Sequence, residues 1–292
     1  MHDFYAHSRP MPLDQADGLR RMFAGRESQR CRVLPLVANP YVPFSGVVLD
    51  RLSAVLSAVL SSALSVPASS VLVVDASSAS PSPHEMAALD LSAGIEAVSP
   101  RVSYLPAGGL PMAYVDTRGS AGGFIDAVQR AAPQAELILL HADAPDLARI
   151  FKRRAARPLL IGSDHPDSIK HAYAGAKLLA QRCCLLSFDL LLAASPQSPR
   201  AASIAQSLAG CVETFLGGVL CHTALIDPAG DTAAPPDAAL AALLAAQLAL
   251  DEVAGTPSAG PLQTVRPPVR TPARAPTPAA AQAPATARPA FR

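Results

Sequence analysis

The feature that most constrains the fold is a series of short, uninterrupted apolar runs separated by longer segments with helical spacing. The clearest runs are SVLVVD at 70–75 and ELILLH at 136–141. A strand that is apolar at consecutive positions must be buried on both faces, which is typical of parallel sheets covered by helices. The pattern therefore predicts an α/β protein with a doubly wound, mostly parallel sheet flanked by helices.

The expected elements alternate along the chain. Strands are predicted at 32–38, 70–75, 102–107, 136–141, 158–163, 185–194 and 215–221. Helices are predicted at 13–23, 46–64, 83–93, 122–132, 146–156, 166–181, 199–209 and 237–253. In sheets of this kind, ligands gather at the carboxyl ends of the strands. Those ends carry Asn39, Asp75, His141, Asp143 and Asp164.

Three regions follow from the changes in composition. Residues 1–30 form an N-terminal arm that holds the first helix, and residues 31–253 form the α/β domain. Residues 254–292 are rich in alanine and proline and have no acidic residue. Proline at this density cannot support a packed core, so the sequence predicts a disordered tail that serves as a spacer or as a docking segment.

Charge and cysteine content narrow the classes of function. The formal net charge is +1 and tryptophan is absent, which gives no reason to expect a nucleic-acid partner. The five cysteines form no CxxC pair, and the N-terminus has no apolar signal segment, so a reduced, cytoplasmic location is expected. Residues 52–74 are uncharged and long enough to span a membrane, but they are rich in serine and contain Pro67. We expect a helix, a turn and a buried strand there, without stable membrane insertion.

A phosphate-binding loop of the usual kind is missing. Such a loop needs glycines that expose backbone N–H groups, and a lysine that reaches the outer phosphates. The chain has only three lysines, and none follows a glycine-rich turn. After the first expected strand the sequence reads NPYVPFSG, from Asn39 to Gly46. Its two prolines remove N–H donors, and its two aromatic residues add bulk where a phosphate would lie. The segment, with Ser45 and Gly46 at its end, is therefore predicted to be a degenerate nucleotide site.

Other clusters of chemically active residues are weaker. The acids and histidines near 141–146 and 164–171 lack the HxH or HxxxH spacing of a metal site, so no metal is predicted. The glycine-rich stretch at 116–123 has no lysine and is expected to be a connecting loop. The basic run at 152–154 is expected to be a solvated helix face, with contact to a partner as the alternative. No GxSxG motif or convincing Ser–His–Asp arrangement is apparent.

Two motifs resemble the MinD/ParA class of P-loop ATPases, and within it the FlhG (FleN) regulators of flagellar number and placement. Asp14-Gln15-Ala16-Asp17-Gly18-Leu19-Arg20 matches the DQAxxLR motif of FlhG proteins. The segment GSDHPDSI at 162–169, followed by an Ala-Tyr helix and Lys-Leu-Leu, is similar to a family segment. The order of the expected elements is similar as well.

The resemblance implies a MinD/ParA-like fold and a specific partner. In FlhG proteins the DQAxxLR helix binds the signal-recognition-type GTPase FlhF and stimulates its GTP hydrolysis. By this resemblance the partner-binding residues are Asp14, Gln15, Ala16, Leu19 and Arg20. The resemblance also implies flagellar basal-body components as further partners, and recruitment of the protein from the cytoplasm to the cell pole.

The nucleotide site departs from the family pattern. Asn39 to Gly46 occupies the place of the family's phosphate loop, and His141 stands where the family has a metal-linked aspartate. Asp75 matches the aspartate that ends the family's second strand. The main hypothesis is therefore a regulator that is not itself an enzyme and needs no cofactor. The alternatives are an ATPase that uses ATP and magnesium at an atypical site, and a scaffold or adaptor protein.

Overall fold

The computed structural model describes residues 31–64, 70–88, 90–230 and 236–254. The predicted helix at 13–23 and the tail after residue 254 lie outside these residues, so the three-region division stays a prediction.

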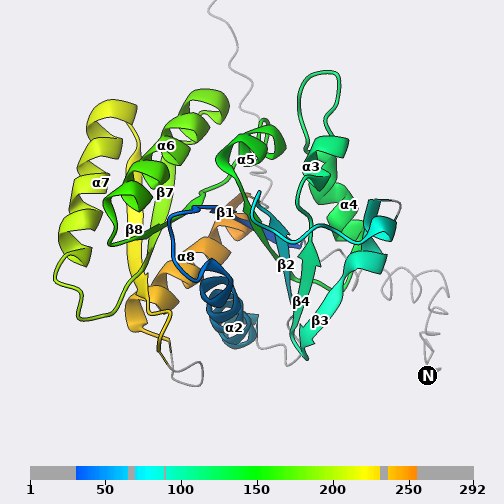
Figure 1. Cartoon of the computed structure of the whole chain (residues 1–292), viewed down its shortest axis with the longest axis horizontal. Coiled ribbons are helices and arrows are strands. Elements are labelled where there is room, and N and C mark those ends of the chain that lie inside the picture. The colour runs from blue at the N-terminus through cyan, green and yellow to red at the C-terminus, as the bar shows by residue number, and fades with distance from the viewer. Residues whose placement is uncertain (1–30, 65–69, 89, 231–235, 255–292) are drawn as a thin grey trace, which may run out of the picture. The chain divides into compact units, whose positions relative to one another are not determined.

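One eight-stranded sheet organises the described residues (Figure 1). Its strands are β1 (Arg32–Val37), β2 (Val71–Ala76), β3 (Glu96–Ser99), β4 (Val102–Pro106), β5 (Leu137–Ala142), β6 (Leu159–Ser163), β7 (Ser187–Ala193) and β8 (Val219–Ile226). Their spatial order is β3-β4-β2-β5-β1-β6-β7-β8. Only β3 runs antiparallel to its neighbour. The prediction of a mostly parallel, doubly wound sheet is thus confirmed.

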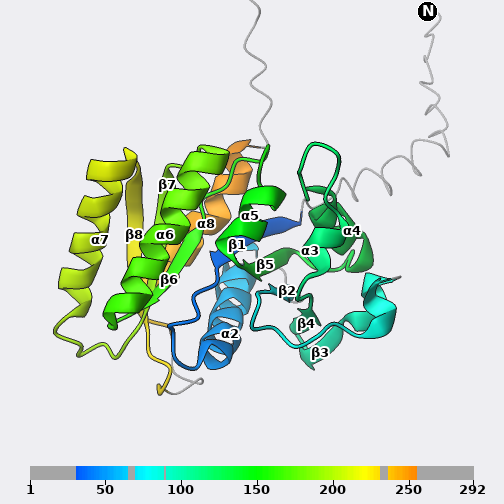
Figure 2. The same ribbon diagram turned by 45° about the horizontal axis from the view of Figure 1, so that its top comes forward.

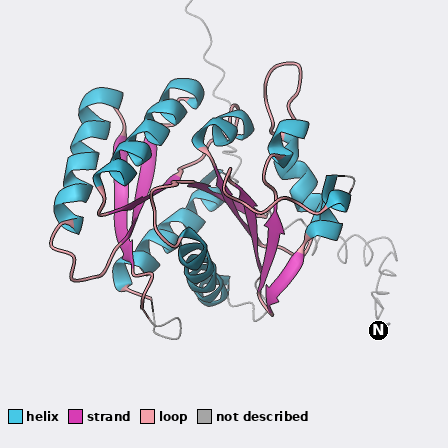
Figure 3. Ribbon diagram, in the orientation of Figure 1, coloured by secondary structure: helices cyan, strands magenta, loops and turns pink. Residues whose placement is uncertain are grey.

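Helices cover both faces of this sheet (Figures 2 and 3). They are α2 (Ser45–Leu64), α3 (Leu110–Ala113), α4 (Gly123–Ala131), α5 (Ala144–Ile150), α6 (Pro166–Cys183), α7 (Ala201–Leu216) and α8 (Ala238–Ala254). Helices α2 and α8 pack on one face, where leucines such as Leu52, Leu56 and Leu243 are fully buried. Helices α4 to α7 pack on the other face around a second apolar cluster that contains Phe124 and Phe188.

A proline in the centre of the sheet has a simple geometric explanation. Arg32 and Ala38 donate their N–H groups to carbonyls of the β5 side, so even-numbered residues of β1 face β5. Pro35 therefore faces β6, whose pairing with β1 begins only at Leu36. No ladder hydrogen bond is lost there, and the strand tolerates the proline.

Several predicted boundaries are wrong for local reasons. The helix expected at 146–156 is α5, which ends at Ile150, and the basic run 152–154 lies in the turns that follow it. The strand expected at 215–221 starts too early, because α7 continues to Leu216 and ends at Gly217, with φ +62°. A left-handed glycine of this kind is a common helix end. The helix expected at 83–93 is two short 3₁₀ helices at 85–88 and 91–94, and β3 and α3 were not predicted.

Helix α2 explains the uncharged segment. Among the described helices, it has the length and apolar character that a membrane span requires. Its buried leucines line up along the side that packs on the sheet, and β2 follows from Val71. The expected order of helix and buried strand is confirmed on either side of residues 65–69.

Candidate functional site

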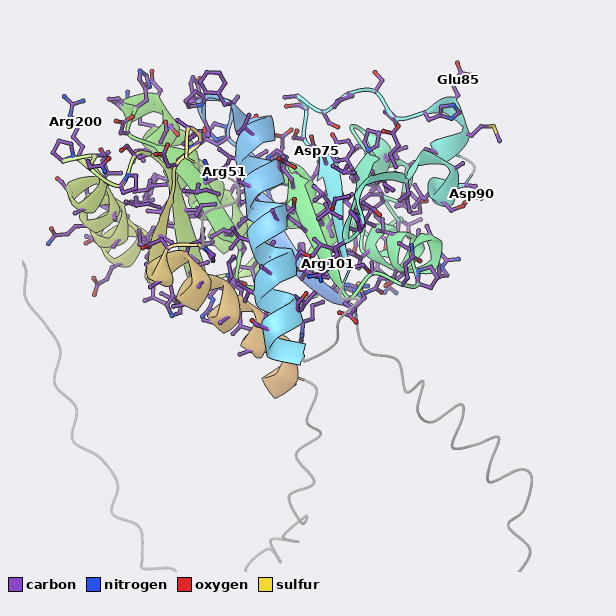
Figure 4. The ribbon with its side chains drawn as sticks, turned by 90° about the horizontal axis from the view of Figure 1, so that it is seen from below. Arg51, Asp75, Glu85, Asp90, Arg101 and Arg200 are labelled. Atoms are coloured by element: carbon purple, nitrogen blue, oxygen red, sulfur yellow. The ribbon has the colours of Figure 1, made fainter. Side chains whose placement is uncertain are left out.

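The carboxyl ends of the central strands bring the predicted polar residues together. Asp75 on β2 is paired in register with His141 on β5, so the two side chains lie next to each other on one face of the sheet. Asn39 follows the end of β1 beside them. In Figure 4, Asp75 lies near the N-terminal half of α2. These three residues were predicted for this edge.

Asp75 and His141 form a buried pair. His141 Nδ1 lies 2.8 Å from Asp75 Oδ1, and both residues are more than 90% buried. The same carboxylate oxygen accepts from Ser77 N at 3.2 Å and Ser77 Oγ at 2.8 Å. The other oxygen accepts from the hydroxyl of Tyr104 at 3.2 Å. With Nδ1 held against the carboxylate, Nε2 is the ring nitrogen left for the cavity that His141 lines.

The charge of Asp75 is stabilised in this position. Burial alone acts to raise the pKa of Asp75. The hydrogen bond and charge of His141, together with the two hydrogen bonds from Ser77, outweigh burial and hold the pKa below its usual value. Burial, together with the charge of the same carboxylate, raises the pKa of Tyr104. Asp75 is therefore an ionised structural acceptor at neutral pH.

Asn39 is occupied by backbone contacts. Its Nδ2 donates to the carbonyls of Ile161 and Ser168, at 2.8 and 2.9 Å, and lies 3.1 Å from Ser168 Oγ. Its Oδ1 accepts from the N–H of Tyr41 at 3.1 Å. The side chain thus joins the end of β1 to β6 and α6 and closes the turn that follows. Both polar atoms of the Asn39 side chain therefore have hydrogen-bond partners within the protein.

The segment from Asn39 to Gly46 forms a tight turn into α2. Ser45 is the first residue of the helix, and Gly46 is the second. Phe44 adopts a left-handed conformation with φ +56° and is 74% exposed, while Tyr41 is 51% exposed. Tyr41 also contacts the ring of His171, with 5.8 Å between the ring centroids. The chain here builds a proline-constrained, aromatic turn in place of a glycine-rich loop.

The hollow at these strand ends is small. It measures about 30 Å³ and is lined by residues that include Asn39, Ser45, Ser77, His141 and Asp143. A volume of this size suits one or a few water molecules, whereas small-molecule pockets span roughly 300–1,000 Å³. None of the described residues that line it is a lysine or an arginine.

The three lysines are used elsewhere. Lys152 donates to the carbonyl of Arg118, and Lys170 pairs with Asp167 at 3.0 Å on the exposed first turn of α6. Lys177 lies exposed further along α6. None of these three lysines lines the hollow at the strand ends.

The remaining candidates have local roles. Asp143 accepts the N–H of Ser78 at 2.9 Å, and Asp164 is exposed. Within the described residues, no group of three or more His, Cys, Asp and Glu side chains has a geometry that would hold a metal ion. In the glycine-rich stretch, Asp116 accepts N–H groups from Arg118 and Ser120, as an ordinary connecting turn does.

Sequence reasoning missed three members of the site. Ser77, Tyr104 and Ser168 complete the hydrogen bonds of Asp75 and Asn39. Ser77 has a local signal, because a serine two residues after an aspartate often bonds back to its carboxylate. Tyr104 and Ser168 have none, since they come from other elements. The residues predicted to bind the partner lie outside the described residues: Asp14, Gln15, Ala16, Leu19 and Arg20.

Comparisons with known proteins give a likeness in fold. No family model and no curated protein matches the sequence. Similar solved structures include a ParA family ATPase from Chlorobium tepidum, with 14% identity and a TM-score of 0.41 over 68% of this chain and 86% of that one. The MinC:MinD cell division complex of Aquifex aeolicus matches with 11% identity and a TM-score of 0.42, over 68% and 82%. A Cyanothece McdA variant bound to ATP matches with 14% identity and a TM-score of 0.40, over 68% and 84%.

These likenesses are distant. The assignment of the fold rests on the observed order and direction of the strands in this chain. ParA- and MinD-type ATPases are thus proteins that the chain resembles in architecture, at low identity.

Proposed function

We propose that this protein is a non-catalytic regulator similar to FlhG, which binds an FlhF-type GTPase through its N-terminal DQAxxLR segment and stimulates GTP hydrolysis. In the cell this role would control the number and placement of flagella, with recruitment to the pole and contact with basal-body components.

The state of the strand-end site carries the non-catalytic part of the proposal. Asp75, His141 and Asn39 bind one another or the protein backbone, and the hollow beside them has room for only a few waters. Phosphoryl transfer depends on cationic groups and metal ions placed around the phosphates. The described lining offers a histidine, serines and an acid instead. Without a lysine or an arginine among them to offset the charge of the phosphates, these lining residues are poorly suited to ATP.

The N-terminal segment carries the partner-binding part. All defined positions of the DQAxxLR motif are present between Asp14 and Arg20. Phosphoryl transfer is helped by polar groups that orient water or offset charge. Gln15 is suited to orient a water or a catalytic loop, and Arg20 is suited to pair with a carboxylate or phosphate. Ala16 and Leu19 are three residues apart, the spacing that places two side chains on one side of a predicted helix, and are suited to supply an apolar contact.

The test is GTP turnover by a purified FlhF-type GTPase with and without the full-length protein. We expect a marked increase in turnover at saturating protein. Variants Gln15→Ala and Arg20→Ala should lose most of the increase. Arg21→Ala is the matched control, because it removes the same side chain one residue beyond the motif and should keep the increase. Equal stimulation by all variants, or none by the native protein, would overturn the proposal.

A further inference from the structure

The two edges of the sheet differ in how they are protected. The edge formed by β3 has four residues, carries Glu96, and its pairing with β4 shifts register between Ala97 and Ser99. Short length, charge and irregular pairing are the devices that keep sheet edges from pairing with other chains. Strand β8, at the opposite edge, has eight residues with the sequence VLCHTALI, which contains no aspartate, glutamate, lysine, arginine or proline.

The outer side of β8 presents backbone groups that β7 does not use. The carbonyl of Ile226 accepts from Ala194, beyond the end of β7. In an extended strand the N–H and C=O of one residue point to the same side, and the direction alternates along the chain. Ala224 therefore also faces β7, whereas Thr223 and Leu225 face away from it. Thr223 is exposed, and within the described residues no strand lies beyond β8.

Several large apolar residues at or before the start of β8 are exposed. Val219 is 52% exposed, and its N–H donates to the carbonyl of Leu186, which is itself 43% exposed. Phe215, near the end of α7 and four residues before Val219, is 71% exposed. Large apolar side chains are thus exposed on the segments that lead into β7 and β8.

We propose that β8 pairs antiparallel with β8 of a second copy of this chain, about a twofold axis, so that the two sheets continue into one another. A twofold contact is self-complementary, so the edge needs a partner strand of its own length and hydrogen-bonding pattern. The second copy supplies one. Because the strand contains no aspartate, glutamate, lysine or arginine, bringing two copies together places no such charges opposite each other.

The register of the pairing follows from an irregularity in β8. Phe188 pairs with Leu220 but Asp189 pairs with His222, so Cys221 is an extra residue that interrupts the regular strand. The regular part runs from His222 to Ile226, with Ala224 at its centre. A twofold axis at Ala224 sets Thr223 of each copy opposite Leu225 of the other, and the backbone N–H and C=O groups of both residues face away from β7, toward the partner.

The oligomeric state of the full chain tests this inference independently of any GTPase. Light scattering coupled to size exclusion should give twice the monomer mass for the native protein at tens of micromolar. Thr223→Lys should shift the equilibrium dissociation constant at least tenfold toward monomer, because it places two charges at the contact. Thr223→Pro should act similarly, since it removes an N–H that faces away from β7.

Two controls make the result decisive. Thr117→Lys adds the same charge in an exposed loop and should leave the dimer intact. Circular dichroism checks that each variant is folded. If Thr223→Pro is unfolded, the result for Thr223→Lys tests the inference. A native protein that stays monomeric at about 100 µM overturns the inference, because this is the upper end of the dissociation constants expected for a weak specific contact. A folded Thr223→Lys variant that dimerises as the native protein does overturns it as well.

Discussion

Asp75 and His141 face each other across two neighbouring strands, with 2.8 Å between Oδ1 and Nδ1 at the carboxyl edge of the sheet. The pair occupies the place where a protein of this architecture would hold a ligand. Both side chains are buried and take part in contacts within the protein. The contact between Asp75 and His141 therefore stabilises the fold, and its contribution to the free energy of unfolding can be measured.

The stability of the native protein should fall in acid partly because of Asp75. Its pKa in the folded state is lower than the ordinary value of 3.8, so its stabilisation is fully present above that value. It is lost as pH falls below 3.8 and through the folded pKa. Asp75→Asn should lower the free energy of unfolding at pH 7 by about 1–3 kcal/mol. Urea denaturation at pH 7, 4 and 3 measures both quantities.

The same titration supplies the contrast for Asp75. The difference in stability between the native protein and Asp75→Asn should shrink as the pH falls below 3.8, because the unfolded native protein then binds a proton at Asp75 that the folded state binds less readily. A difference that stays constant from pH 7 to pH 3 would show that the charge of Asp75 contributes nothing to stability.

Removing a second buried carboxylate should lower the free energy of unfolding more than removing that of Asp75. Asp189 on β7 is fully buried and lies 3.0 Å from Arg157 Nε, 2.6 Å from Gln247 Nε2 and 2.9 Å from the N–H of His222. Asp189→Ala removes one partner of a buried ion pair and leaves the guanidinium of Arg157 without compensation. The expected loss is about 3–5 kcal/mol, measured by urea denaturation at pH 7.

The matched control for Asp189 is an ion pair on the surface. Asp126 pairs with Arg154 at 2.6 Å, and both side chains are well exposed. Asp126→Ala removes the same chemical group and should change the stability by less than about 1 kcal/mol. Similar losses for the two variants would contradict the conclusion that buried Asp189, which joins β7 to β8 and α8, contributes more to stability than a surface carboxylate does.

The aromatic turn at the start of α2 should be strained. Phe44 has φ +56°, a conformation that costs residues other than glycine about 1–2 kcal/mol and that asparagine adopts more readily. Phe44→Asn should therefore raise the free energy of unfolding by about 0.5–1 kcal/mol. Tyr41→Asn, in the same turn but without a positive φ, should bring no gain. Thermal unfolding of both variants measures the difference, and a less stable Phe44→Asn would refute the strain.

The class of the fold could be predicted from the sequence, because apolar runs such as 70–75 and 136–141 are stable only in a sheet that is covered on both faces. It placed Asn39, Asp75 and His141 at one edge for the same reason. It could not indicate β3, a four-residue strand whose side chains are all exposed and which has no apolar pattern. It also assigned Gly217 and Gly218 to a strand, although Gly217 ends α7 in a left-handed conformation.

The pairing within the site depended on register, which local patterns do not encode. Asp75 meets His141 because β2 and β5 pair in a fixed alignment, and Tyr104 reaches the same carboxylate from β4. Asn39 reaches Ser168 over a sequence separation of 129 residues. Such contacts are set by the packing of the whole sheet, so the closed state of the site became visible only in the structure.

The central claim is that the strand-end site is closed to nucleotide, and titration calorimetry of the full-length protein with ATP and magnesium tests it most directly. We predict no saturable heat up to millimolar ATP, because the hollow holds only a few waters and no lysine or arginine lines it in the described residues. Saturable binding that is weakened by Asp75→Asn or His141→Ala would place ATP at this site and contradict the account.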